Sequence, residues 1–319
     1  MPAIDGLQIN DWSRDILLEC RAGGIDAVNA TCAVWEGEAE TRAQVAALHR
    51  LCADNADVAA IVGSAAEIEA LDGRVGILPG FQNCSPFEDR LELVGSFRDA
   101  GVRVAQLTYN TRNLVGGSCY DAVDEGLTRF GRAVIEEMHR VGMLVDLSHV
   151  GDRTCREAID ASPGPVAITH ANPRSYKDVP RNKPDDVIRA VAERGGVIGV
   201  CLYPAVAHAD RDGFAAMVEG LVDMVGVEHV AIGTDCTRGW GRDYLLYLRA
   251  GRREPLAGEE LPAWPAWPAW FQGPADWPVL AELVPDERVL GATWLRLLRE
   301  RSEEHTSELQ SRVDISYAV

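Results

Sequence analysis

Residues 126–150, GLTRFGRAVIEEMHRVGMLVDLSHV, are the stretch of the chain that decides its fold. The first part repeats apolar side chains at the spacing of one helix face and then reaches a glycine of the kind that ends helices, at Phe130, Val134, Ile135, Met138 and Gly142. The second part, MLVDLSH, is a short and nearly continuous apolar run, which is typical of a parallel strand buried on both faces. The stretch therefore predicts a helix that leads directly into a buried strand ending at His149.

The same alternation extends in both directions from this stretch. Helical patterns separate short apolar runs, and the best capped of them, PDDVIRAVAERGG at 184–196, opens with a proline and two acids and ends in glycine. Eight strand–helix units predict one α/β domain, a (β/α)8 TIM barrel, over residues 1–300. A doubly wound open sheet is the alternative, although no GxGxxG motif follows an early strand. The eight predicted strands are Ala3–Ile9, Ile25–Val34, Val75–Gln82, Val102–Tyr109, Met143–His149, Pro165–His170, Val197–Tyr203 and His229–Asp235.

The pattern changes after the eighth strand. The segment GRREPLAGEELPAWPAWPAWFQGPADW, residues 251–277, is rich in proline and tryptophan and has no clear period. It is interpreted either as a loop that packs on the rim of the barrel or as a lid that lines the substrate pocket. A final helix is expected at Asp286–Arg299, where it closes the barrel. Residues 301–311, RSEEHTSELQS, match the translation of a common sequencing adapter, so we expect 301–319 to be a non-native tail and leave His305 out of the site.

Composition and charge exclude several classes of protein. Hydrophobic residues make up 47% of the 319 residues and charged residues 25%, as in an ordinary globular enzyme. A net charge of −18 repels both phosphate backbones and anionic lipid, so neither nucleic acid nor a membrane is an expected partner. The eight cysteines form no CxxC pair, which indicates reduced thiols. With no signal peptide and no apolar run of about 18 residues, the expected location is the cytoplasm.

Polar side chains gather at the carboxyl ends of the predicted strands, which is where α/β barrels carry their functional groups. His149 and His170 end two successive strands, and two imidazoles on neighbouring strands are able to share one zinc ion. A single strand-end histidine is more often structural, but two in register beside an aspartate favour a metal site. Asp146, inside the fifth predicted strand, is expected to be either a structural carboxylate or one that orients a metal ligand. The other polar residues at strand ends or just beyond them are Gln82, Asn83, Tyr109, Asn110, Ser148, Thr169, Arg181 and Asp235.

Four segments in order give the chain a resemblance to a known family. The segments are GLTRFGRAVIEEMHRVGMLVDLSHV, PVAITHANPRS, PRNKPDDVIRAVAERGGVIGV and GVEHVAIGTD, and a weaker match follows at LGATWLRLL. They resemble the membrane dipeptidases, the zinc dipeptidases of peptidase family M19. The resemblance implies a metallo-dependent, amidohydrolase-like barrel whose two zinc ions share a bridging glutamate, and it implies a homodimer in many members.

The resemblance also implies roles for individual residues. His149 and His170 match two of the family's metal ligands. Arg181 matches the arginine that holds a substrate carboxylate, and an ion pair with an acid of the next helix is its structural alternative. Asp235 matches the aspartate that relays protons. Tyr109 falls where the family has the histidine that steadies the tetrahedral intermediate.

The chain departs from the family pattern at three metal ligands. It reads DGLQI where the family has DGHND on the first strand, so Leu7 and Ile9 replace a histidine and an aspartate. Gln82 stands at the bridging glutamate and is a neutral, weaker ligand. We therefore expect at most one zinc ion, held by the two histidines with Gln82, while water or Asp235 fills its remaining positions. A chain without metal is the alternative.

These residues predict a hydrolase that cleaves a C–N bond in a small carboxylate-bearing substrate, such as a dipeptide or an N-acyl compound. The metal would acidify a bound water, Asp235 would take its proton, and Tyr109 would donate to the oxyanion. Arg181, Tyr109 and Asn110 would bind the substrate. Because ligands are missing, ordinary dipeptidase turnover is expected to be weak. Two other functions stay open: metal-free action on a different small molecule, and a non-catalytic binding protein on an enzyme scaffold.

Overall fold

Eight parallel strands form a barrel at the centre of the molecule. The computed structural model describes residues 2–208 and 210–300. The barrel strands follow one another in chain order, and each neighbouring pair is parallel, as expected where helices connect the strands. Their bounds are β1 Ile4–Gln8, β2 Ala27–Ala33, β4 Val75–Phe81, β5 Val104–Gln106, β6 Leu144–Asp146, β7 Ala167–Ile168, β8 Val197–Val200 and β9 Val230–Ile232.

The last strand returns to the first and closes the barrel. Ile9 N donates to Cys236 O at 2.9 Å, and Asp235 N donates to Leu7 O at 3.1 Å, just beyond the ends of β9 and along β1. A parallel bridge joins Gln8 to Cys236. The TIM barrel predicted from the sequence is therefore confirmed, and the open-sheet alternative is wrong.

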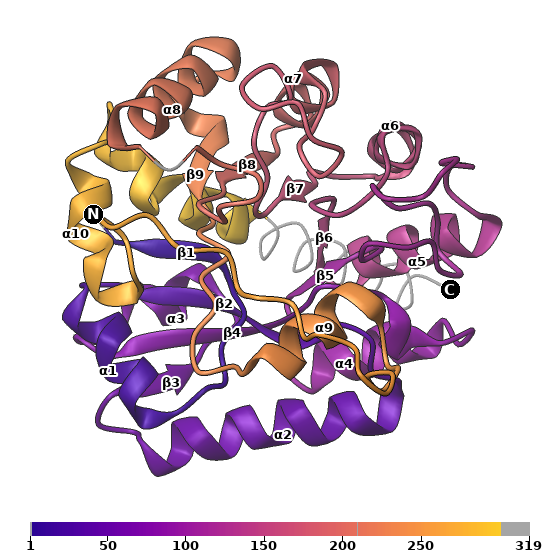
Figure 1. The fold of residues 1–319 in the computed structure, drawn as a ribbon, viewed down its shortest axis with the longest axis horizontal. Helices are drawn as coiled ribbons and strands as arrows, with labels where there is room; N and C mark the ends of the chain where they lie inside the picture. Colours follow the sequence, from indigo (N-terminus) through magenta and orange to yellow (C-terminus); the bar gives the residue numbers. More distant parts are fainter. Residues whose placement is uncertain (1, 209, 301–319) are drawn as a thin grey trace, which may run out of the picture.

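Helices surround the strands (Figure 1), with α2 along one edge of the view and α7 and α8 along the opposite one. The helix predicted from the deciding stretch is α5, whose N-cap Thr128 accepts a hydrogen bond from Gly131 N and whose apolar face is buried in the main core. The α-helices are α1 Arg14–Ala22, α2 Glu38–Asp54, α3 Ala65–Glu69, α4 Glu92–Asp99, α5 Arg129–Arg140, α6 Asp152–Ala161, α7 Asp185–Glu193, α8 Arg211–Val225, α9 Arg242–Ala250 and α10 Trp277–Ala281. Short 3-10 turns lie at Ser85–Phe87, Val227–His229, Pro274–Asp276 and Glu287–Leu290.

Two elements go beyond the sequence prediction. The strand β3, Ala59–Ile61, pairs with β4 outside the path of the barrel, and three residues are too few to show a period. The helix α9 follows the eighth barrel strand and buries Leu245, Leu246 and Leu248. It begins and ends next to glycines, so the sequence did carry a signal for it.

The predicted strands run past the observed ones at their polar ends. The sixth predicted strand, Pro165–His170, forms strand only over Ala167–Ile168. A side chain replaces the ladder beyond that point, because Asp146 Oδ1 accepts hydrogen bonds from the backbone N–H groups of Ser148 and Thr169. The segments just beyond β6 and β7, which carry the two histidines, are therefore held in place by a buried carboxylate rather than by sheet pairing.

The amino-terminal end of the barrel is plugged by Trp294. A helix runs from 292 to 300, and the Trp294 indole N–H donates to a carbonyl of β9 at 2.8 Å. The ring packs among the first inward-facing side chains of the strands and against Gly6, where any added Cβ would collide with it. The closing helix predicted at Asp286–Arg299 is thus present but begins later, because the 3-10 turn Glu287–Leu290 precedes it.

The proline- and tryptophan-rich segment 251–277 divides its tryptophans between two environments. Trp267 packs edge-on against Tyr203, and Trp270 packs against Phe214, as in a loop that covers the rim. Trp264 instead lines the cavity at the mouth of the barrel. The lid and the rim loop both stay predictions for this segment.

Other expectations concern cysteines, membranes and the tail. All eight cysteines are free, seven of them buried and Cys119 half-buried, as expected of reduced thiols. Over the part of the chain that the structure describes, no helix combines the length and apolar character needed to cross a bilayer. The non-native tail predicted at 301–319, with His305, lies outside the described residues.

Candidate active site

A cavity of about 500 Å³ opens at the carboxyl ends of the strands. Residues singled out from the sequence line it, namely Gln82, Tyr109, Asn110, His149, Arg181 and Asp235. His170 lies next to His149 and is fully buried, with its Nε2 3.2 Å from the Nε2 of His149. The two strand-end histidines therefore meet at one point, as two ligands of one ion must.

Hydrogen bonds decide where each imidazole carries its proton. Asn110 Oδ1 lies 2.8 Å from His149 Nδ1, and the amide nitrogen donates to a carbonyl of α9, so the amide oxygen accepts the Nδ1 proton of His149. Thr169 Oγ1 lies 2.7 Å from His170 Nδ1 and donates its own hydrogen to Asp146, so it too accepts. Both Nε2 atoms are left with lone pairs that face each other. This arrangement has room for an electron-pair acceptor between the two rings.

A proton is a poor candidate for that acceptor. Burial lowers the pKa of His149 and of His170 well below the ordinary value, and the Arg181 guanidinium lowers both further. The two rings are therefore neutral near pH 7. Neutral imidazole is the form that binds divalent metal ions.

Asp146 supports the histidine pair from behind. It is fully buried at the end of β6, and its two oxygens accept four hydrogen bonds, from the N–H and hydroxyl groups of Ser148 and Thr169, at 2.6–3.0 Å. Burial raises the pKa of Asp146, while these hydrogen bonds lower it. The carboxylate thus joins the ends of β6 and β7 and sets the direction of the Thr169 hydroxyl.

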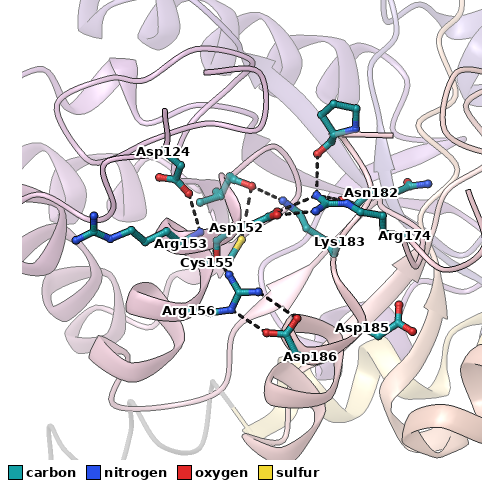
Figure 2. Close-up of polar contacts among 12 residues, drawn as sticks. Asp124, Asp152, Arg153, Cys155, Arg156, Arg174, Asn182, Lys183, Asp185 and Asp186 are labelled. Carbon is teal, nitrogen blue, oxygen red and sulfur yellow. Dashed lines mark hydrogen bonds and ion pairs between the residues drawn. The ribbon is translucent and has the colours of Figure 1, made fainter. Parts of the chain in front are cut away.

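Arg181 is held at the mouth by the strands that carry the histidines. Its guanidinium donates to Ser148 O at 2.5 Å and to His170 O at 2.7 Å. Two acids of α7, Asp185 and Asp186, were the alternative partners of Arg181. Asp186 pairs with Arg156 of α6 (Figure 2), and Asp185 accepts a hydrogen bond from Ser175 N. Among the described residues Arg181 forms no ion pair with either acid, and its side chain lines the cavity.

The loop that carries this arginine is anchored by two other cations (Figure 2). Arg174 donates to Asp152 of α6 at 2.6 Å and to Asn182 O at 2.9 Å, so it joins the loop to the start of that helix. Lys183 is fully buried and donates to Val150 O. These bonds hold the loop against the ends of β6 and β7.

Asp235 and Tyr109 face the cavity from the ends of β9 and β5. Burial raises the pKa of Asp235 to about 7, although the Arg181 guanidinium acts in the opposite direction. Burial and the Asp235 charge raise the pKa of Tyr109 well above 10, so it stays a neutral donor, and its ring stacks on His149 at 4.2 Å. Asp235 and Asn110 both have φ near +60°, a conformation that non-glycine residues adopt mainly where function or packing holds them.

The first-strand side of the site is apolar. Leu7 is 1% exposed, and Ile9 packs in a cluster that includes Leu248 of α9. Gln82 donates through Nε2 to Thr31 Oγ1 at 3.0 Å, which leaves its Oε1 as the atom able to act as a ligand. Within residues 2–208 and 210–300, no three His, Cys, Asp or Glu side chains come together as a metal site. Gln82 and His149 line the same cavity, and His170 lies beside His149.

Several residues of the cavity wall were not singled out from the sequence, among them Tyr120, Tyr203 and Arg249. Tyr203 lies just beyond β8 and was expected to be the last residue of an apolar strand. Arg249 belongs to α9, and the pattern RDYLLYLRA between Gly241 and Gly251 could have revealed that helix. Asn110 was expected to bind substrate, and its amide is already bonded to His149 and to α9, which gives it a positioning role.

Comparison with known proteins places this site in a family. Residues 15–242 match the family described as membrane dipeptidase, peptidase family M19. That match runs from α1 to the start of α9 and includes both histidines, Arg181 and Asp235. The chain belongs to the membrane dipeptidase family. The resemblance seen in the sequence is therefore confirmed. Membrane dipeptidases are accordingly the proteins with which the metal-ligand positions of this chain are compared.

Relatives of this membrane dipeptidase family member differ in how much of it they match. An uncharacterized dipeptidase of Schizosaccharomyces pombe is 31% identical over 177 residues, which are 53% of this chain and 43% of the relative. The chain spans about half the length of the curated relatives it matches. An amidohydrolase from Pseudomonas aeruginosa is 37% identical, with a TM-score of 0.86 over 94% of this chain and 96% of that one. A metallo peptidase from Rhodobacter sphaeroides, liganded with a phosphinate mimic of L-Ala-D-Ala, is 17% identical with a TM-score of 0.77 over 94% and 99%, which is a likeness of fold alone.

Proposed function

We propose that this member of the membrane dipeptidase family hydrolyses a peptide or amide C–N bond in a small carboxylate-bearing substrate, with at most one divalent metal ion, preferably zinc. The observation that carries the proposal is the pair of Nε2 atoms of His149 and His170, which lie 3.2 Å apart with both Nδ1 protons already used. Arg181, Asp235 and Tyr109 line the same cavity and supply the other groups that such hydrolysis needs.

One divalent ion fits this pair of histidines, and two do not. Zinc–nitrogen bonds of about 2.0–2.1 Å at a tetrahedral angle place two ligand nitrogens about 3.3 Å apart, close to the separation seen here. Gln82 Oε1 is the third candidate ligand, whereas Leu7 and Ile9 offer no lone pair for a second ion. When bound, a zinc ion lowers the pKa of a coordinated water and polarises a carbonyl group.

The side chains of the cavity divide the remaining work. Arg181 uses two of its five N–H groups on strand carbonyls and has others for a substrate carboxylate. Asp235, with a pKa of about 7, is suited both to accept the proton of the attacking water and to return it to the leaving amine. Tyr109 keeps its hydroxyl proton at neutral pH and donates a hydrogen bond to the oxyanion.

The proposal extends to the surroundings of the site. Residues 1–300 act as one functional unit in which the segment 251–277 covers the mouth as a lid and Trp264 contacts the substrate, since that side chain already lines the cavity. A homodimer and a place in the cytoplasm stay predictions from the sequence.

Metal analysis together with a substrate panel tests the proposal. Protein purified without added metal is analysed for its elements, stripped with a chelator, and titrated with cobalt, whose visible absorption reports the ligand field. We expect at most one tightly bound ion per chain, lost in His170→Ala and kept in His208→Ala, a histidine exposed outside the cavity. The loaded protein is then assayed on L,L- and L,D-dipeptides and N-acyl amino acids.

Two outcomes would overturn the proposal. Two stoichiometric ions would show that the apolar first strand does not prevent a second site. No ion at any zinc or cobalt concentration, with no turnover of the panel, would favour a binding protein on an enzyme scaffold.

A further inference from the structure

The charge of the cavity is opposite to the charge of the chain. The chain carries a formal net charge of −18. The cavity wall nevertheless contains two guanidinium groups, Arg181 and Arg249, and one carboxyl group, Asp235. The cavity is therefore positive and attracts anions.

Arg249 is the cation that the proposed hydrolysis does not use. It lies in the last turn of α9, lines the same cavity as Arg181, and is exposed. Two other arginines near the ends of α9 are engaged, because Arg242 donates to Pro262 O and Arg252 pairs with Glu40. Over residues 2–208 and 210–300, Arg249 forms no ion pair with any carboxylate.

Two tyrosines locate Arg249 relative to the rest of the cavity. Burial raises the pKa of Tyr203 to about 12, and hydrogen bonding to Arg249 acts against that rise, so the guanidinium lies beside the Tyr203 hydroxyl. Burial also raises the pKa of Tyr120, while the charges of Arg181 and Arg249 both lower it. Tyr120 therefore lies within electrostatic reach of both guanidinium groups.

The wall near these two cations includes apolar side chains. Ile9, Tyr109, Leu248 and Trp264 lie in one hydrophobic cluster, and all four line the cavity. A molecule that contacts both arginines in this cavity therefore also has an apolar surface available to it. This combination suits a short organic diacid better than a substrate with one carboxylate.

We propose that Arg181 and Arg249 bind two separate acidic groups of one substrate, so that the preferred substrate is a dipeptide or N-acyl amino acid with a second carboxylate. The inference rests on the proposed hydrolysis for its bond class and on the cavity for its second charge. Arg249 acts here as a specificity-determining residue, because it contacts the part of the substrate that does not react.

Pairs of substrates that differ only in charge test this directly. The wild-type protein is assayed on Ala-Glu against Ala-Gln and on Glu-Ala against Gln-Ala, in which an amide replaces a carboxylate of the same shape. We expect kcat/KM to favour the acidic member of at least one pair about five- to tenfold, since the guanidinium is partly exposed. Arg249→Gln should bring this ratio close to one, Arg252→Gln should leave it unchanged, and added salt should reduce it in the wild type.

A binding measurement keeps the test independent of turnover. Linear diacids of four to seven carbons and their monoamides are titrated calorimetrically into wild type and Arg249→Gln, with folding checked by circular dichroism. A diacid preference that Arg249→Gln abolishes supports the inference even if no peptide is cleaved, in which case the proposed hydrolysis alone is wrong. Turnover of peptides with equal rates for the acidic and amide members overturns the inference and leaves the hydrolysis standing. Equal binding of diacids and monoamides by the wild type overturns it as well.

Discussion

Asp146 controls which nitrogen of His170 is free to bind a metal ion. As a carboxylate it accepts the Thr169 hydroxyl hydrogen at 2.7 Å, so Thr169 Oγ1 presents a lone pair to His170 Nδ1. The imidazole then carries its proton on Nδ1 and leaves Nε2 as the ligand atom. Asp146→Asn keeps the shape of the side chain and reverses this order.

The expected magnitude follows from the hydrogen bonds of that site. The asparagine oxygen keeps the two backbone N–H groups on Oδ1, while its nitrogen replaces Oδ2 and donates to Thr169 Oγ1. The threonine hydroxyl must then donate to His170 Nδ1, which moves the ring proton to Nε2. Exchanging charge-assisted for neutral hydrogen bonds costs about 1–3 kcal/mol of stability. Metal affinity should fall about 10- to 100-fold, the usual effect of removing the partner that orients a ligand.

Asp5→Asn is a matched control. Asp5 is also fully buried and accepts from Thr234 N at 2.8 Å, Thr234 Oγ1 at 2.6 Å and Gln8 Nε2 at 2.8 Å. Asp5 joins β1 to β9 much as Asp146 joins β6 to β7. Among the described residues, however, the threonine that Asp5 binds, Thr234, has no histidine as a hydrogen-bond partner. Its substitution should weaken the fold to a similar or smaller degree and leave metal affinity unchanged.

The assay compares the three proteins under one set of conditions. Zinc affinity is measured by competition with a chromophoric chelator at pH 7.5, and stability by urea unfolding of the metal-free proteins. The reasoning is refuted if Asp146→Asn binds zinc within twofold of the wild type, or if Asp5→Asn loses as much affinity as Asp146→Asn.

Further predictions concern substrate binding, pH and the missing ligands. Arg181→Lys should raise KM about tenfold or more, because the three N–H donors of an ammonium group cannot bond two strand carbonyls and both oxygens of a carboxylate, and an unchanged KM would contradict its assignment. The kcat/KM should rise with pH through about 7, as Asp235 ionises into its base form, and a profile that is flat from pH 5 to 9 would exclude that role. Leu7→His combined with Ile9→Asp should destabilise the fold by about 2–4 kcal/mol without creating a second tight zinc site, since Ile9 is buried among apolar side chains, and thermal unfolding with elemental analysis checks both. On simple uncharged dipeptides kcat/KM should stay below about 10⁴ M⁻¹s⁻¹, and a higher value in a steady-state assay would show that the missing ligands are dispensable.

The sequence alone determined the barrel and the order of its strands. Buried parallel strands read as continuous apolar runs, and eight of them alternating with helices leave few architectures open. Because functional groups of a barrel lie where strands end, His149, His170 and Asp235 could be assigned to one mouth before any coordinates were known. The replacement of ligands by Leu7 and Ile9 was equally visible, since a side chain without a lone pair cannot bind metal in any conformation.

Only the tertiary structure decided how these groups act on one another. The direction of the Thr169 hydroxyl depends on Asp146 of the neighbouring strand, and the tautomer of His149 depends on an amide that α9 holds in place. Arg249 lines the cavity because α9 packs beside the ends of the barrel strands. No pattern in the sequence predicts that α9 and those strand ends come together. Periodicity along the chain reports which face of an element is buried, but hydrogen-bond direction and the meeting of distant side chains are fixed only when the barrel closes.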